Sequence, residues 1–144
     1  MRILAIDLGE KRTGTAICDE KEIISYPLKV ILEENRNKLV EKISNIVKES
    51  KVEMILVGFA KNMDGSSGEK AKKCQQFAQN LKKELNIPIT LWDERQTTKL
   101  AMRFMNESHV NKKKKKKIVD CVSATIILDS FIEFRKNKNE VKLV

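Results

Sequence analysis

The chain has 144 residues, of which 41% are hydrophobic and 34% charged, and its net charge is +9. This length suits one domain with a substantial core, and the composition excludes an intrinsically disordered protein. No apolar run reaches the roughly 18 residues of a membrane helix, and Asp7 interrupts the apolar start too early for a signal peptide. We therefore expect a cytoplasmic protein with no membrane partner.

The positive charge is concentrated in one segment. The lysine run consists of Lys112, Lys113, Lys114, Lys115, Lys116 and Lys117. These six residues account for six of the nine net charges, so the remainder of the chain is close to neutral. This distribution favours an anionic partner that is bound at one place.

The three cysteines do not form a zinc motif. Cys18, Cys74 and Cys121 contain no C-x-x-C pair, and His109 is the only histidine. A structural zinc site needs about four such ligands at short spacings, so we expect small buried thiols in a reducing compartment.

The first third of the chain predicts three strands and a helix. Residues 2–7, 13–19 and 22–26 are the expected strands, and Pro27 closes the third. Short connections between strands imply antiparallel hairpins. Residues 35–50 carry apolar side chains at spacings of three and four, which predicts an amphipathic helix.

The remainder of the chain alternates strands and helices. Ser66 or Ser67 is expected to cap the first of these helices, whose free backbone amides could face a substrate phosphate. The expected elements are a strand over residues 52–59, a helix over 69–86, a strand over 87–92, and helices over 97–107 and 116–135.

This order predicts an α/β fold. Three antiparallel strands followed by βα units give a mixed five-stranded sheet flanked by helices. We expect one domain over residues 1–136 and a polar tail over residues 137–144. Ligands of such sheets gather beyond the carboxyl ends of the strands.

Carboxylates occupy those positions. Asp7 ends the first strand, and Asp93 and Glu94 end the last one. Asp120 begins a stripe of the last helix that we expect to face the core. The other members of this stripe are Ala124, Ile127, Phe131 and Phe134. A carboxylate on such a surface is costly unless a positive group compensates it.

Convergence of these acids would create a metal site. Two carboxylates about 5 Å apart repel by roughly 3 kcal/mol at an effective dielectric of 20, so three need protons, arginine or metal. Oxygen ligands alone favour Mg²⁺ or Mn²⁺, and two such ions can hydrolyse a phosphodiester. Each acid also has a structural alternative: Asp7 as a turn former, Asp93 or Glu94 as a helix cap, and Asp120 paired with lysine. Spacing does not choose between Asp93 and Glu94.

Several segments resemble one known family. Residues 6–14 (IDLGEKRTG) are similar to the opening D-x-G-x-K-R-x-G of the YqgF/RuvX family of pre-16S rRNA nucleases, once described as Holliday junction resolvase-like. Residues 57–66 resemble its V-G-x-P-x-N-M-D-G-S segment, and residues 92–98 resemble its D-E-R-x-[ST]-T segment. The lysine run followed by Asp120 resembles its last motif. Ala60, Gln96 and Cys18 depart from the family pattern without removing a carboxylate.

The resemblance implies an RNase H-like fold in which Asp7, Glu94 and Asp120 are the catalytic and metal-binding residues. It also selects Glu94 over Asp93. It implies a metal-dependent endonuclease that processes the 5′ end of pre-16S rRNA, with the ribosome or its precursor as a partner. Nucleic acid is expected to contact the lysine run and three residues beside the acids, namely Lys11, Arg12 and Arg95.

Three other functions remain open at this point. A resolvase of branched DNA would need a homodimer for paired cuts, whereas an RNA processing enzyme could be a monomer. A non-catalytic RNA-binding factor would use the lysines for binding and the acids for a structural ion. An actin-like ATP-binding module shares the Asp7-Leu8-Gly9 motif, but 144 residues are too few for its two lobes.

Overall fold

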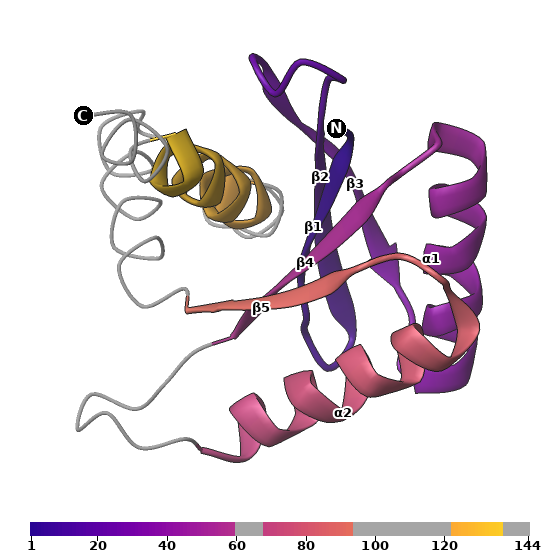
Figure 1. Ribbon diagram of the computed structural model, residues 1–144. Helices are drawn as coiled ribbons and strands as arrows, with labels where there is room; N and C mark the ends of the chain where they lie inside the picture. Colours follow the sequence, from indigo (N-terminus) through magenta and orange to yellow (C-terminus); the bar gives the residue numbers. More distant parts are fainter. Residues whose placement is uncertain (60–67, 94–121, 137–144) are drawn as a thin grey trace, which may run out of the picture.

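A five-stranded mixed sheet forms the centre of the protein in a computed structural model, which describes residues 1–59, 68–93 and 122–136 (Figure 1). The strand order is β3-β2-β1-β4-β5. The strands are β1 (Ile3–Asp7), β2 (Arg12–Cys18), β3 (Ser25–Leu32), β4 (Met54–Phe59) and β5 (Ile89–Asp93). β2 pairs antiparallel with β1 and β3, whereas β4 pairs parallel with β1 and β5. The predicted mixed sheet is therefore confirmed.

Helices cover both faces of the sheet. The helices α1 (Arg36–Ser50) and α2 (Glu69–Glu84) lie on one face, and a helix over residues 122–136 lies on the other (Figure 1). Successive residues of a strand point to opposite faces, so each strand contributes to both layers. In β1, Leu4 and Ile6 pack toward α1 and α2, while Ile3 and Ala5 pack toward the helix over 122–136.

The helix over residues 122–136 is held by one apolar stripe. The buried apolar residues of this helix are Ala124, Ile127, Leu128, Phe131 and Ile132, which recur at the spacings of one helix face. Phe134 was expected on this stripe, but 51% of its surface is exposed, so that prediction is wrong. The rotation from Phe131 to Phe134 carries the ring to the margin of the packed face.

Most element boundaries agree with the sequence, with two exceptions. The third strand is predicted over residues 22–26, but β3 begins at Ser25 and continues through Pro27 to Leu32. An edge strand tolerates proline, since the missing N–H can face away from the neighbouring strand. The residue that caps α2 is Gly68, with no side-chain hydrogen bond, so capping by Ser66 or Ser67 is wrong.

Some predictions fall outside the described residues. They are the helix over 97–107, the first residues of the last helix (116–121) and the tail over 137–144. Within the described ranges, no helix is long and apolar enough to cross a membrane. Cys18 and Cys74 are buried thiols, as predicted, and burial raises the pKa of Cys18 above its usual value. Cys121 and His109 lie outside the described residues.

Candidate active site at the carboxyl edge of the sheet

The three parallel strands end at one edge of the sheet. Asp7, the last residue of β1, pairs with Gly58 of β4, and Phe59 of β4 pairs with Asp93, the last residue of β5. The chain therefore brings the ends of β1 and β5 to the two sides of the end of β4. This confirms that Asp7 closes the central strand at the edge where an α/β sheet binds its ligands.

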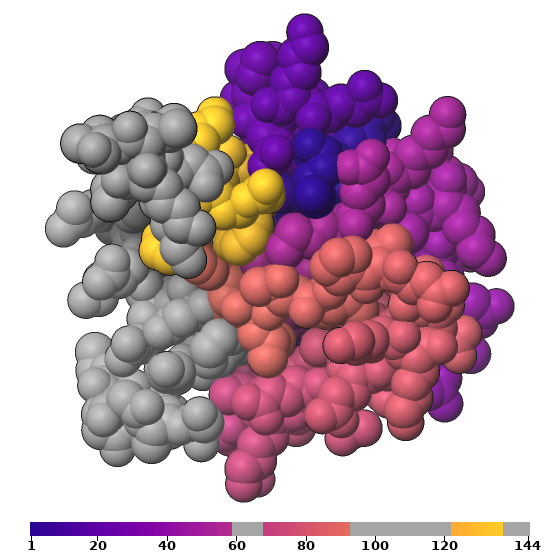
Figure 2. Space-filling model, in the orientation of Figure 1, coloured from indigo at the N-terminus to yellow at the C-terminus, as the bar shows by residue number. Residues whose placement is uncertain are grey.

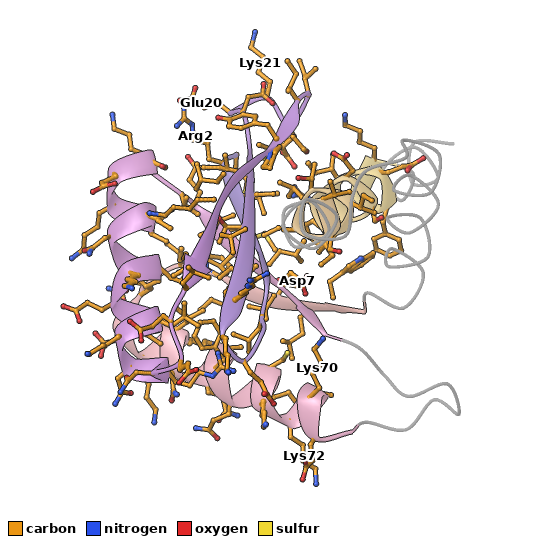
Figure 3. The ribbon with its side chains drawn as sticks, turned by 180° about the vertical axis from the view of Figure 1, so that it is seen from behind. Arg2, Asp7, Glu20, Lys21, Lys70 and Lys72 are labelled. Atoms are coloured by element: carbon orange, nitrogen blue, oxygen red, sulfur yellow. The ribbon has the colours of Figure 1, made fainter. Side chains whose placement is uncertain are left out.

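Asp7 faces the helix over residues 122–136. Its side chain follows Ile3 and Ala5 on the same face of β1, and both of those residues pack against that helix. Figure 3 shows Asp7 at the end of β1, between that helix and the side of the molecule that carries α2 and Lys70. Asp7 is partly buried and has interactions of its own within the protein.

The positions on either side of Asp7 are glycines. Gly14 of β2 and Gly58 of β4 are its register partners on the two neighbouring strands. Directly paired residues of adjacent strands point to the same face, so neither neighbour places a side chain beside the carboxylate. Trp92 of β5 pairs with Gly58 and continues this row across the sheet. Glycine at both register positions therefore means that neither flanking strand covers Asp7 with a side chain of its own.

Close backbone contacts constrain the turn that follows Asp7. A Cβ on Gly9 would overlap the carbonyl oxygen of Arg12 and lie 3.1 Å from its carbonyl carbon. Glycine is therefore required at this position because two backbone segments approach closely. From α1, Arg36 donates a hydrogen bond through Nη1 to the carbonyl oxygen of Gly9 at 2.9 Å.

Sequence reasoning did not identify Arg36 as part of this site. Arg36 is the first residue of α1 and lies 27 positions from Gly9 in the chain. A cation at the first turn of a helix is the less favourable placement, since the amino end of a helix carries partial positive charge. That mismatch is the one sequence signal that could have suggested a tertiary partner for Arg36.

Of the predicted nucleic-acid contacts, Arg12 lies on the same side as Asp7. Arg12 starts β2 two residues before Gly14, so its side chain leaves the sheet on the face of Asp7. Lys11 is largely exposed and its Nζ lies 3.8 Å from a carboxylate oxygen of Glu34. Arg95 and the lysine run, residues 112–117, lie outside the described residues.

A cavity of about 370 Å³ adjoins the turn after Asp7. Its charged lining joins the start of α1 to the start of α2, and a salt bridge of 3.6 Å connects Lys73 to Glu10 across it. The lining residues are Leu8, Gly9, Glu10, Arg36, Glu69, Lys70 and Lys73. Because its capping residue is Gly68, the amino end of α2 has no side-chain cap. The contact between this helix end and a substrate phosphate remains a prediction.

The other two predicted acids are not part of the described structure. Glu94 follows Asp93 directly, and Asp120 precedes the helix over 122–136 by two residues, but both lie outside the described residues. Among residues 1–59, 68–93 and 122–136, no three His, Cys, Asp or Glu side chains form a group that could hold a metal. Convergence of the three acids therefore remains a prediction.

Comparisons with a family model and with known proteins point to the same family. A family model described as "RuvX: Holliday junction resolvase" matches residues 1–134. A protein of Thermoanaerobacter pseudethanolicus is 39% identical over 139 residues, covering 96% of this chain and 100% of its own, and is named "Putative pre-16S rRNA nuclease". A protein of Bacillus thuringiensis with the same name is 39% identical over 135 residues, covering 92% of this chain and 98% of its own.

Solved structures show a related fold at low sequence identity. RuvC of T. thermophilus in complex with a Holliday junction substrate aligns with a TM-score of 0.61 and 12% identity, over 95% of this chain and 96% of that chain. Fowlpox virus resolvase in complex with Holliday junction DNA aligns with a TM-score of 0.57 and 14% identity, over 92% and 97% of the two chains. These similarities concern the fold.

Proposed function

The chain belongs to the RuvX family, and from this premise we propose that it is a metal-dependent endonuclease that processes the 5′ end of pre-16S rRNA. Its fold is that of the RNase H-like resolvases, and the family relation makes it a hydrolase of phosphodiester bonds. The observation that carries the proposal is the position of Asp7. This carboxylate ends the central strand between two glycines, on the face covered by the helix over residues 122–136.

The donor chemistry at this edge fits Mg²⁺ or Mn²⁺. Asp7 supplies carboxylate oxygens between two glycines. The Cys74 thiol belongs to the core on the opposite face of the sheet, where it donates a hydrogen bond to the Gly58 carbonyl oxygen at 3.5 Å, and the Cys18 thiol lies near Met1. In the proposal, Asp7 holds divalent ions, two in number, together with Glu94 and Asp120. Bound ions supply Lewis-acid stabilisation of the charge that develops on the phosphate.

In the proposal, basic residues bind and orient the substrate. Arg12 leaves the sheet on the Asp7 face and can pair with a phosphate of the cleaved strand, as can Lys11 and Arg95. The lysine run, residues 112–117, supplies further phosphate contacts, each of which adds close to one unit to the salt dependence of binding. Arg36 holds the turn that follows Asp7 through its bond to Gly9.

Cleavage assays with matched variants test this function. Wild-type protein, Asp7→Asn and Asp129→Asn are incubated with precursor 16S rRNA and Mg²⁺ or Mn²⁺. Asp129 is an exposed carboxylate of the helix over 122–136, so its variant controls for the loss of one negative charge. We expect Asp7→Asn to abolish cleavage and to remain folded, and Asp129→Asn to cut like wild type. Cleavage by Asp7→Asn at the wild-type rate would refute the assignment.

Resolution of branched DNA is the second candidate, because the family description names a Holliday junction resolvase. A four-way DNA junction tested in parallel with the precursor rRNA separates the two substrates. Paired cuts in a junction need two active sites related by symmetry, so this candidate also requires a dimer in sedimentation experiments. A protein that binds RNA with a steep salt dependence but cuts neither substrate would instead be a non-catalytic RNA-binding factor.

A further inference from the structure

The structure gathers aromatic side chains where β5 meets the helix over residues 122–136. The chain has seven aromatic residues, and Trp92, Phe131 and Phe134 form one cluster. The ring centroids of Trp92 and Phe131 are 5.4 Å apart with the rings nearly perpendicular, and those of Trp92 and Phe134 are 5.3 Å apart. We call these three residues the aromatic cluster.

The aromatic cluster has a rigid base and an exposed side. Phe131 is buried against the sheet, and the Arg135 guanidinium lies 5.5 Å from the centre of its ring while also pairing with Glu22 at 3.0 Å. Trp92 is partly buried against the same layer. Phe134, in contrast, exposes 51% of its surface. The indole is therefore held in place by two rings, one of which faces solvent.

Trp92 connects the aromatic cluster to the proposed active site. Trp92 and Asp7 lie in the same row across the sheet, and Gly58 is the one position between them. Two strand spacings separate their Cα atoms by about 10 Å. Stacked nucleotides advance about 3.4 Å along a strand, so a strand with a phosphate at Asp7 spans the distance to Trp92 in about three nucleotides. On the face seen in Figure 2, the helix over 122–136 adjoins β5.

We propose that the aromatic cluster is a stacking site for an unpaired base of the substrate strand, close to the phosphate at Asp7. Half-exposed aromatic residues are ordinary when they are isolated. Phe134 is not isolated, because its ring touches an immobilised tryptophan in the row of Asp7. A base inside a duplex has both of its faces covered, whereas an unpaired base can stack on an aromatic ring. This inference rests on the proposed nuclease function and adds a preference for a single-stranded segment beside the cut.

The single tryptophan of the chain reports on the stacking directly. A short single-stranded RNA is titrated in EDTA, so that binding is measured without cleavage. We expect it to quench Trp92 fluorescence and to bind Phe134→Ala about 5- to 150-fold more weakly than wild type. The same RNA with abasic positions should bind wild type with a similar loss, and a fully paired duplex should bind wild type and Phe134→Ala equally.

Tyr26→Ala is the matched control. Tyr26 is an aromatic residue of the edge strand β3, at the opposite end of the strand order from Trp92, and 44% of its surface is exposed. Both variants remove an exposed ring, so neither is expected to impair folding, which circular dichroism verifies. Tyr26→Ala should bind the single-stranded RNA like wild type. The loss in Phe134→Ala should persist at high salt, because stacking, unlike phosphate contacts, releases few counterions.

Two results would overturn the proposal. One is equal binding of single-stranded RNA by Phe134→Ala and wild type, or of intact and abasic RNA by wild type. The other is a dimer that Phe134→Ala converts to a monomer in sedimentation, which would make the cluster a contact between two copies of the chain. Neither result depends on the cleavage assay. If stacking is absent but cleavage still requires Asp7, the stacking proposal fails and the nuclease function stands. If stacking is present but no substrate is cut, the nuclease function fails and the aromatic cluster belongs to a protein that only binds nucleic acid.

Discussion

The bond from Arg36 to Gly9 links the helix α1 to the turn that follows Asp7, and its removal tests how firmly that turn is held. In Arg36→Gln the guanidinium is lost, and the shorter amide does not reach the same carbonyl oxygen. A hydrogen bond to a charged group contributes about 1.5–3 kcal/mol to stability. At about 2.1 cal/mol/K per residue, a chain of 144 residues unfolds with an entropy of about 0.3 kcal/mol/K. We therefore expect Arg36→Gln to lower the melting temperature by about 5–10 °C.

The functional consequence is measured in the same variant. The turn directly follows Asp7, so a looser turn should reduce metal-dependent cleavage at temperatures where the variant is fully folded. Lys38→Gln is the matched control, because it removes one positive charge from the same turn of α1 at an exposed position. Differential scanning calorimetry and the rRNA cleavage assay are run on both variants. Equal melting temperatures for Arg36→Gln and Lys38→Gln would show that the bond to Gly9 does not hold the turn.

Three further predictions concern the turns and the row beside Asp7. Gly9→Ala should cost about 1–3 kcal/mol of unfolding free energy because its Cβ meets the backbone of Arg12, and denaturant unfolding measures this loss. Gly58→Val should weaken Mn²⁺ binding by about 10- to 100-fold, since its side chain would lie on the same face of the sheet directly beside Asp7, and calorimetric titration of the folded variant measures the loss. The Asp19 carboxylate accepts hydrogen bonds from the backbone N–H groups of Ile24 and Ile23, which lower its pKa below the usual 3.8. The ionised Asp19 carboxylate therefore stabilises the fold above pH 3.8, and this stabilisation is lost as the pH falls through the lowered pKa. Wild type should melt at a higher temperature than Asp19→Asn near neutral pH, and the two melting temperatures should converge once the pH is below that pKa.

The sequence alone determined the order and type of most elements. The apolar run before Asp7 and the periodic residues of α1 specify a strand and a helix through local patterning, and the structure has both within a residue or two. The same patterning placed Asp7 at the end of a strand. The family motifs likewise depend on residues close together in the chain, and the family they suggested is confirmed over residues 1–134.

Local patterning did not determine what depends on a strand's neighbours. Pro27 reads as a strand end in isolation, yet β3 passes through it because the strand lies at the edge of the sheet. Phe134 fits an apolar stripe by spacing, yet 51% of its surface is exposed because its ring lies at the margin of the packed face, beside Trp92. In both cases the outcome depends on which element lies alongside, and spacing within one segment carries no information about that.

The candidate site likewise combines residues that the sequence identified with neighbours that only the tertiary structure revealed. The sequence supplied Asp7 and its flanking basic residues, and the resemblance supplied Glu94 and Asp120 as its partners. Only the tertiary structure set glycines on both sides of Asp7, brought Arg36 to Gly9 across 27 positions, and gathered Trp92 with Phe134. Strand register and helix docking create these neighbours, and both are fixed by burying apolar surface across the whole domain. The identity of a reactive residue can thus be read locally, whereas the space and the neighbours that surround it are properties of the complete fold.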